Sequence, residues 1–152
     1  MESRHLPDKV AFSSDRELDA ETEVCLQHVK TDDFEPLKLK TSLELLASKS
    51  RESDTLRHKL AEPGILERII EIITRVTKSP NGPLHPALRC IGNACFENED
   101  AANHVSSLYL NWLIDMLRVG DRETVAIASN VLYNICIPVS YTHLTLPTKR
   151  IV

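Results

Sequence analysis

The sequence predicts an all-α fold built from a helical repeat, and three observations lead to this prediction. The 152 residues include only four Gly and 5% aromatic residues, whereas a β-sandwich or barrel needs many turns. Leu, Ile and Ala recur at helical spacing along most of the chain. Two short motifs, each with an Asn followed two residues later by a Cys, also align 41 residues apart, which is typical of a helical repeat protein.

The composition limits the class of protein. With 42% hydrophobic and 26% charged residues the chain is of the globular type, and its length suits one domain. Its apolar runs are too short to cross a membrane and its first residues contain no secretory signal, so we expect a cytoplasmic protein. Its 18 basic and 22 acidic residues give a charge of −4, which argues against nucleic acid as the main partner.

The chain is expected to begin with a polar segment. Residues 1–14 are predicted to be flexible, and residues 15–36 to form a helix and a linker. Ser14 or Asp15 is the expected cap of this helix, which ends near Lys30.

Three helices are expected in the next stretch of the chain. Leu at helical spacing predicts a helix over 37–48, and two further Leu lie on one side of a short helix over 54–62. Pro63-Gly64 forms a sharp corner before the amphipathic stretch Ile65–Thr77. We expect the Ile side chains of that stretch to lie in the core rather than on lipid.

The segment after it is divided by the clearest loop of the sequence, Ser79–Pro83. Pro86 suits the first turn of the following helix, which ends near Phe96. A polar turn over 98–103 then leads into another short helix.

Two helices are predicted at the end of the repeated region. The first covers 109–119 and repeats the apolar pattern of the Ile-rich stretch, with Trp112 expected to pack in the core. Gly120-Asp121 breaks it, and the last helix covers 123–137.

A repeated motif sets the architecture. Ile91-Gly-Asn-Ala-Cys95 and Leu132-Tyr-Asn-Ile-Cys136 align without a gap, and each has an Asn in the middle of an apolar turn. Leu43-Glu-Leu-Leu-Ala47 is a weaker third copy, in which Leu45 takes the place of the Asn. The repeats are therefore placed over 37–138, with equivalent third helices near 37–48, 84–97 and 122–137.

The sequence contains no pattern that indicates catalysis or metal binding. It lacks the nucleophile-elbow, zinc-protease, phosphate-loop and dinucleotide-binding motifs, its six His are scattered, and no Cys pair has C-x-x-C spacing. We therefore expect no enzyme activity, cofactor or metal. The four Cys are expected to be small apolar residues in helical packing: Cys25, Cys90, Cys95 and Cys136.

Three segments resemble the consensus of armadillo repeats. They are Leu88–Cys95, the polar turn Glu97–Asp100 and Asn130–Cys136. The resemblance covers roughly 37–137, and it implies an armadillo/HEAT-like right-handed α-solenoid fragment of about 2.5 repeats, truncated at its C-terminus. In armadillo proteins a Gly usually forms the corner between the first two helices of a repeat. Gly64 matches this Gly, whereas Leu108 takes the place of the Gly at the equivalent position of the later repeat.

The resemblance also implies a partner-binding groove. Asn93 and Asn134 match the armadillo Asn that lines the concave groove and hydrogen-bonds extended peptides. Arg89 and Asn130 lie four residues earlier, where peptide-binding members often have Trp. The alternative is that the two matching Asn bond the backbone of the neighbouring repeat.

Within this superfamily the chain most resembles the armadillo stimulators of GDP dissociation. The resemblance lies in Ala87–Cys95 with the Glu-Asn turn after it, and in Leu132–Pro138. It implies a protein partner, namely a Rho- or Rap-type small GTPase with a basic prenylated tail. The armadillo protein would loosen the nucleotide bound to this GTPase or chaperone the GTPase, and it would need no catalytic side chains for either role. The alternative is a general adaptor that binds an extended peptide in the groove.

The last residues depart from the helical pattern, since Thr and Pro replace Leu and Ala in Val139–Thr148. The codons GTC TCT TAT ACA CAT CTG ACG CTG CCG ACG would encode them, and that string resembles a transposase adapter read through in short-read sequencing. We therefore expect the natural protein to be cut near Ile137 and residues 139–152 to be non-native. A genuine disordered C-terminus is the alternative, and the source nucleotides would distinguish the two.

Truncation would have two consequences. Without Lys149 and Arg150 the charge becomes −6, which suits a basic partner. The last helix would also lack a following unit, so we expect self-association through its exposed apolar side. The side chains concerned are Val125, Ile127, Ala128, Val131, Leu132, Ile135 and Ile137.

Overall fold

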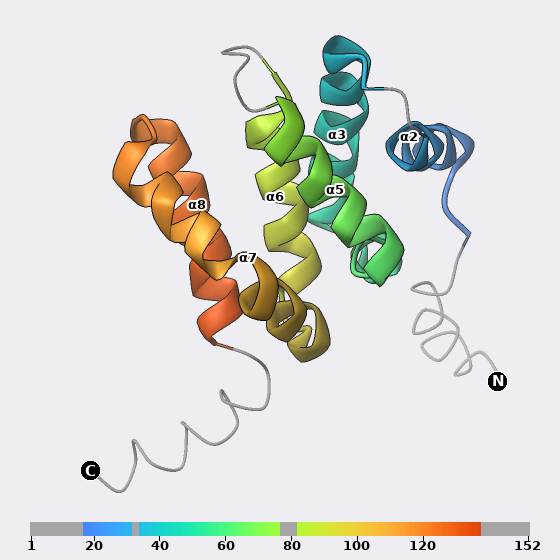
Figure 1. The fold of residues 1–152 in the computed structure, drawn as a ribbon. Helices are drawn as coiled ribbons and strands as arrows, with labels where there is room; N and C mark the ends of the chain where they lie inside the picture. Colours follow the sequence, from blue (N-terminus) through green and yellow to red (C-terminus); the bar gives the residue numbers. More distant parts are fainter. Residues whose placement is uncertain (1–16, 32–33, 77–81, 138–152) are drawn as a thin grey trace, which may run out of the picture.

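The computed structural model describes residues 17–31, 34–76 and 82–137, and these residues confirm the all-α prediction. Seven helices and no strands occur among them (Figure 1). They are α2 (Ala20–Lys30), α3 (Pro36–Ser50), α4 (Asp54–Leu60), α5 (Pro63–Val76), α6 (Leu84–Cys95), α7 (Glu99–Val119) and α8 (Arg122–Cys136). No helix in this part of the chain is both long and apolar enough to cross a membrane.

Helices α3, α6 and α8 lie side by side, with α6 between the other two (Figure 1). The contacts between α3 and α6 advance in the same direction along both helices. The Cys90 thiol of α6 faces the Leu43 carbonyl of α3, and further along both helices Asn93 donates to the Ala47 carbonyl. Contacts between α6 and α8 advance in the same way, from His85 and Thr124 to Gly92 and Asn134, so the three helices run parallel. They lie at the positions predicted for equivalent third helices.

Helix α5 contributes one side of the core, as predicted. Its apolar side chains from Ile65 to Ile73 are at most 3% exposed and pack with those of α6. Helix α2 covers α3, with Leu26 and Val29 fully buried. Trp112 of α7 is partly buried and packs against the core, as expected.

The first described helix begins later than predicted. Asp19 accepts a hydrogen bond from the Thr22 amide (2.8 Å), so it caps α2 at Ala20, and residues 17–19 before it are not helical. The predicted cap residues Ser14 and Asp15 lie outside the described residues. So do the flexible segment 1–14, most of the loop at 79–83, and the tail at 139–152.

The prediction of two helices between residues 98 and 119 was wrong. Helix α7 is one continuous helix of 21 residues, and Leu108 lies inside it with its side chain 57% exposed. Without Gly or Pro at the expected corner, nothing interrupts the helical hydrogen bonds. The earlier corner does exist, but Ala61 and Glu62 form it, and Gly64 belongs to the first turn of α5 with no positive φ.

The last helix is less exposed than predicted. Helix α8 packs against α6 and α7, and Ile127, Ala128, Val131 and Ile135 are at most 8% exposed. Only three members of the predicted apolar set are half-buried: Val125, Leu132 and Ile137. The apolar residues of α8 therefore mainly face inward.

Candidate functional site

The predicted partner-binding residues lie on one surface, formed by the parallel helices α3, α6 and α8. We call it the three-helix face. Asn93 is half-buried on α6, and its amide nitrogen donates to the Ala47 carbonyl (3.1 Å) and to the Ser50 hydroxyl (2.8 Å) of α3. Both amide hydrogens of Asn93 are thus used within the fold.

Asn134 makes the equivalent contact one repeat later. Its amide nitrogen donates to the Gly92 carbonyl of α6 (2.9 Å). Gly92 allows this approach, because a Cβ there would lie 3.3 Å from a methyl group of Val131 on α8. The two asparagines therefore link α3 to α6 and α6 to α8 in the same way.

These two bonds also define the register between the helices. Ala47 of α3 and Gly92 of α6 accept from equivalent asparagines, so they are equivalent positions. It follows that Ser48, which is exposed, corresponds to Asn93. The predicted match of Leu45 to Asn93 is three residues out of register, and Leu45 instead packs against the core.

Arg89 and Asn130 are the exposed members of the predicted set. The Arg89 guanidinium lies 3.4 Å from the carboxylate of Glu123, which connects α6 to α8. Nearby, His85 shares a hydrogen bond of 2.8 Å with the Thr124 hydroxyl and lies 3.5 Å from the same carboxylate. Because the Arg89 pair is exposed, it contributes little to stability and leaves both charges accessible to a partner.

An arginine and an aromatic ring that the sequence analysis did not single out lie at one end of this face. Arg57 donates to the carbonyls of Ser50 (2.8 Å) and Arg51 (3.0 Å), and its guanidinium lies over the Phe96 ring at 5.4 Å. Together with Asn93 they line a hollow of about 210 Å³. No spacing rule links α4 to the end of α6, so only the fold brings these residues together.

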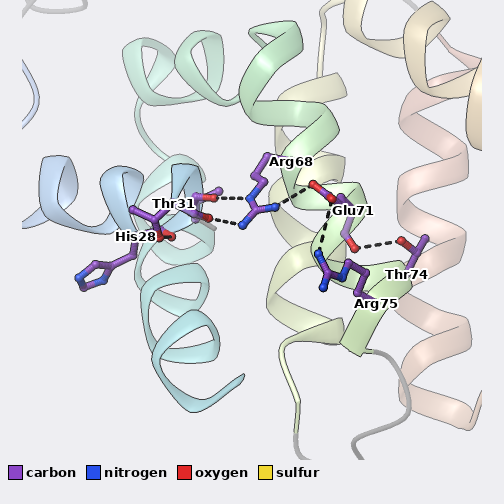
Figure 2. Close-up of polar contacts among 7 residues, drawn as sticks. His28, Thr31, Arg68, Glu71, Thr74 and Arg75 are labelled. Atoms are coloured by element: carbon purple, nitrogen blue, oxygen red, sulfur yellow. Dashed lines mark hydrogen bonds and ion pairs between the residues drawn. The ribbon is translucent and has the colours of Figure 1, made fainter. Parts of the chain in front are cut away.

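A second arginine cluster fixes α2 to the rest of the fold (Figure 2). Arg68 of α5 donates to the Val29 carbonyl (2.9 Å) and to the Thr31 carbonyl, and it also bonds Glu71 (2.8 Å). These bonds satisfy carbonyl groups at the C-terminus of α2, which the helix itself cannot pair. Phe34 has Arg68 at 4.3 Å and Arg75 at 3.7 Å from its ring centre, so this cluster holds α2 against α5.

Two features of the described residues concern metal binding and thiol chemistry. They contain no group of His, Cys, Asp and Glu placed to hold a metal ion. Three of the four free Cys are buried, and burial raises the pKa of Cys95 to about 12, so its thiol stays protonated. Cys136 is exposed, unlike the buried residue that was predicted.

Comparison with protein-family models, with curated proteins and with solved structures finds no match for this chain.

Proposed function

We propose that this chain is an armadillo-like solenoid module that binds a protein partner and regulates a small GTPase, either by stimulating GDP release or by chaperoning it. The observation that carries the proposal is the pair of equivalent asparagine bonds. They join α3, α6 and α8 into a parallel row and leave the three-helix face open. Repeated helices with an extended shared face are typical of solenoids that bind proteins.

The charge of the chain supports a basic partner. The whole sequence carries −4, and the tail contributes Lys149 and Arg150 but no acid. An acidic module attracts a polybasic segment, and the attraction weakens as salt is added. A GTPase with a basic C-terminal tail fits this requirement.

The geometry favours this function over an extended-peptide adaptor. An adaptor of that kind would use its groove asparagines to hydrogen-bond the peptide backbone. The amide hydrogens of Asn93 are both donated to α3, and Asn134 donates to α6. A globular partner can instead use the exposed side chains of Arg89 and Asn130.

A nucleotide-release assay tests the proposal. Rho- and Rap-type GTPases, prenylated and loaded with a fluorescent GDP analogue, are mixed with the chain and with excess unlabelled nucleotide. We expect faster release with a GTPase that retains its basic tail, and a smaller effect once the tail basic residues are replaced by Gln. No acceleration and no binding with any of these GTPases would refute the proposal.

Matched variants locate the binding surface. Asn130→Arg adds positive charge at an exposed position of the three-helix face, and we expect it to reduce binding of the basic GTPase at least tenfold. Asn111→Arg is the control, because Asn111 is exposed on α7 outside that face. Equal loss of binding in the control would place the interface elsewhere.

A further inference from the structure

Among residues 17–31, 34–76 and 82–137, no helix covers one end of the row, as a comparison of equivalent residues shows. Residues of α5 correspond to residues of α7 that lie 44 positions later in the sequence. Residues of α6 correspond in the same way to residues of α8 that lie 41 positions later. Leu66, Ile70 and Ile73 of α5, and Leu88, Gly92 and Cys95 of α6, are all buried. Their counterparts are half-buried or exposed: Leu110, Ile114 and Leu117 of α7, and Ser129, Tyr133 and Cys136 of α8.

The size of this difference is clear at two positions. Ile70 is 3% exposed, whereas its counterpart Ile114 is 40% exposed. Gly92 is buried against Val131 and Asn134 of α8, whereas its counterpart Tyr133 is 63% exposed. The six counterparts, which we call the end face, therefore continue a surface that is an interface one repeat earlier.

The opposite end of the row is closed. Helix α2 lies across α3 and α5, where Cys25, Leu26 and Val29 are buried and Arg68 holds the end of the helix. A second copy therefore cannot add to that end in the way α8 adds to α6. Head-to-tail growth into a filament is blocked, and a contact through the end face has to join like surfaces.

We propose that the end face binds the end face of a second copy of this chain, in a two-fold dimer with the two α8 helices antiparallel. The exposed stripe of α8 is self-complementary in this arrangement. Tyr133 packs over Ala126 of the second copy, and Ser129 lies opposite the second copy's Asn130. A large side chain thus meets a small one on both sides of the axis, and the polar residues meet at its centre.

Electrostatics and size set the strength of the dimer. Antiparallel helices place opposite ends of their dipoles together, which favours the pairing. Helix α8 is about 22 Å long and about 10 Å wide, so its stripe and the margin of α7 bury less than the roughly 1,200 Å² of a stable interface. We therefore expect a reversible dimer in the micromolar range.

Sedimentation of the full chain, from low micromolar to several hundred micromolar, tests the proposal. The expected result is a concentration-dependent monomer–dimer equilibrium. Tyr133→Arg and Ala126→Arg should each raise the dimer dissociation constant at least tenfold, and circular dichroism should show that both variants keep their helix content. Leu37→Arg is the control, because Leu37 is 69% exposed on α3, far from the end face, and should leave the equilibrium unchanged.

Cross-linking tests the antiparallel register. In a Cys136→Ser background, the Ser129→Cys thiols of two copies would lie roughly 1.5 Å apart along the helix axis, whereas Arg122→Cys thiols would lie about 22 Å apart. A short bismaleimide should therefore cross-link the first variant as a dimer and leave the second monomeric. The same reagent distinguishes head-to-tail assembly, which would not cross-link Ser129→Cys to itself.

Three outcomes would overturn the proposal. They are a monomer at every concentration, an assembly that both arginine variants leave intact, and efficient cross-linking of Arg122→Cys with none of Ser129→Cys. Asn130 belongs to both surfaces, so the two proposals are separated with Tyr133→Arg, which alters the end face alone and should leave GTPase binding unchanged. The dimer and the proposed function therefore stand or fall separately.

Discussion

The role of Asn93 gives the sharpest test of how this fold is held together. Replacing Asn93 with Ala removes hydrogen bonds to the Ala47 carbonyl and to the Ser50 hydroxyl of α3. Ser50 is fully buried, so its hydroxyl oxygen cannot recover the lost donor from water. A net contribution of about 0.5–1.5 kcal/mol for each of the two bonds gives an expected loss of about 1–3 kcal/mol in the free energy of unfolding.

The matched control is Asn130→Ala. Asn130 is an exposed Asn on α8, and no hydrogen bond of its side chain occurs among the described residues. We expect its replacement to change the free energy of unfolding by less than about 0.5 kcal/mol. The comparison therefore isolates the interhelical bonds from the general effect of removing an Asn.

Urea unfolding followed by circular dichroism measures both variants, and thermal unfolding provides a second reading. For a chain of this length the Asn93→Ala loss corresponds to a decrease of about 2–12 °C in Tm. A loss for Asn93→Ala no larger than for Asn130→Ala would refute the reasoning. Asn93 would then serve the groove rather than the fold.

Four further predictions concern single residues. Gly120→Ala should lower the free energy of unfolding by about 1–3 kcal/mol in urea titrations, because its Cβ would lie 2.6 Å from the Met116 carbonyl oxygen. Gly64→Ala should raise it by about 0.4–1 kcal/mol in the same titrations, because no atom lies within 4 Å of the added Cβ. Arg68→Lys keeps the charge but loses the paired bonds to the end of α2, so a loss of about 1.5–3 kcal/mol and faster hydrogen exchange in α2 are expected, whereas unchanged exchange would contradict the clamp. A backbone hydrogen bond from Thr124 holds the pKa of the Asp121 carboxyl below its usual 3.8, so its stabilisation is present above about pH 4 and is lost on further acidification. Asp121→Asn, which still caps α8, should make stability fall less steeply between pH 5 and pH 3 than in the unaltered chain.

The sequence predicts the helices best where apolar periodicity is strong. The Ile-rich pattern of α5 identifies a core helix, and the structure buries those Ile side chains. The continuity of α7 escapes the same reasoning, because a polar turn at Asn98 and an expected corner at Leu108 suggested two helices. Leu is one of the strongest helix formers, so Leu108 itself favours a continuous helix, and the expected corner came only from the resemblance.

The candidate surface is predicted only in part. The repeated motif identifies Asn93 and Asn134 as equivalent, and their bonds to the preceding helices follow the same pattern. The motif does not show which way the amide hydrogens point. Arg68 and Arg57 depend on contacts between segments far apart in the chain, and local spacing carries no signal for them.

The first half of the row contains two helices, α4 and α5, where the second half contains the single helix α7. This difference gives the two halves different mechanical properties. Helix α7 is a rod of about 31 Å with no joint. The first half has two corner residues, Ala61 and Glu62, which take part only in the terminal hydrogen bonds of α4 and α5. Under a bending load we therefore expect the curvature of the row to change first at this corner. The end that contains α7 and α8 would then move as a rigid body.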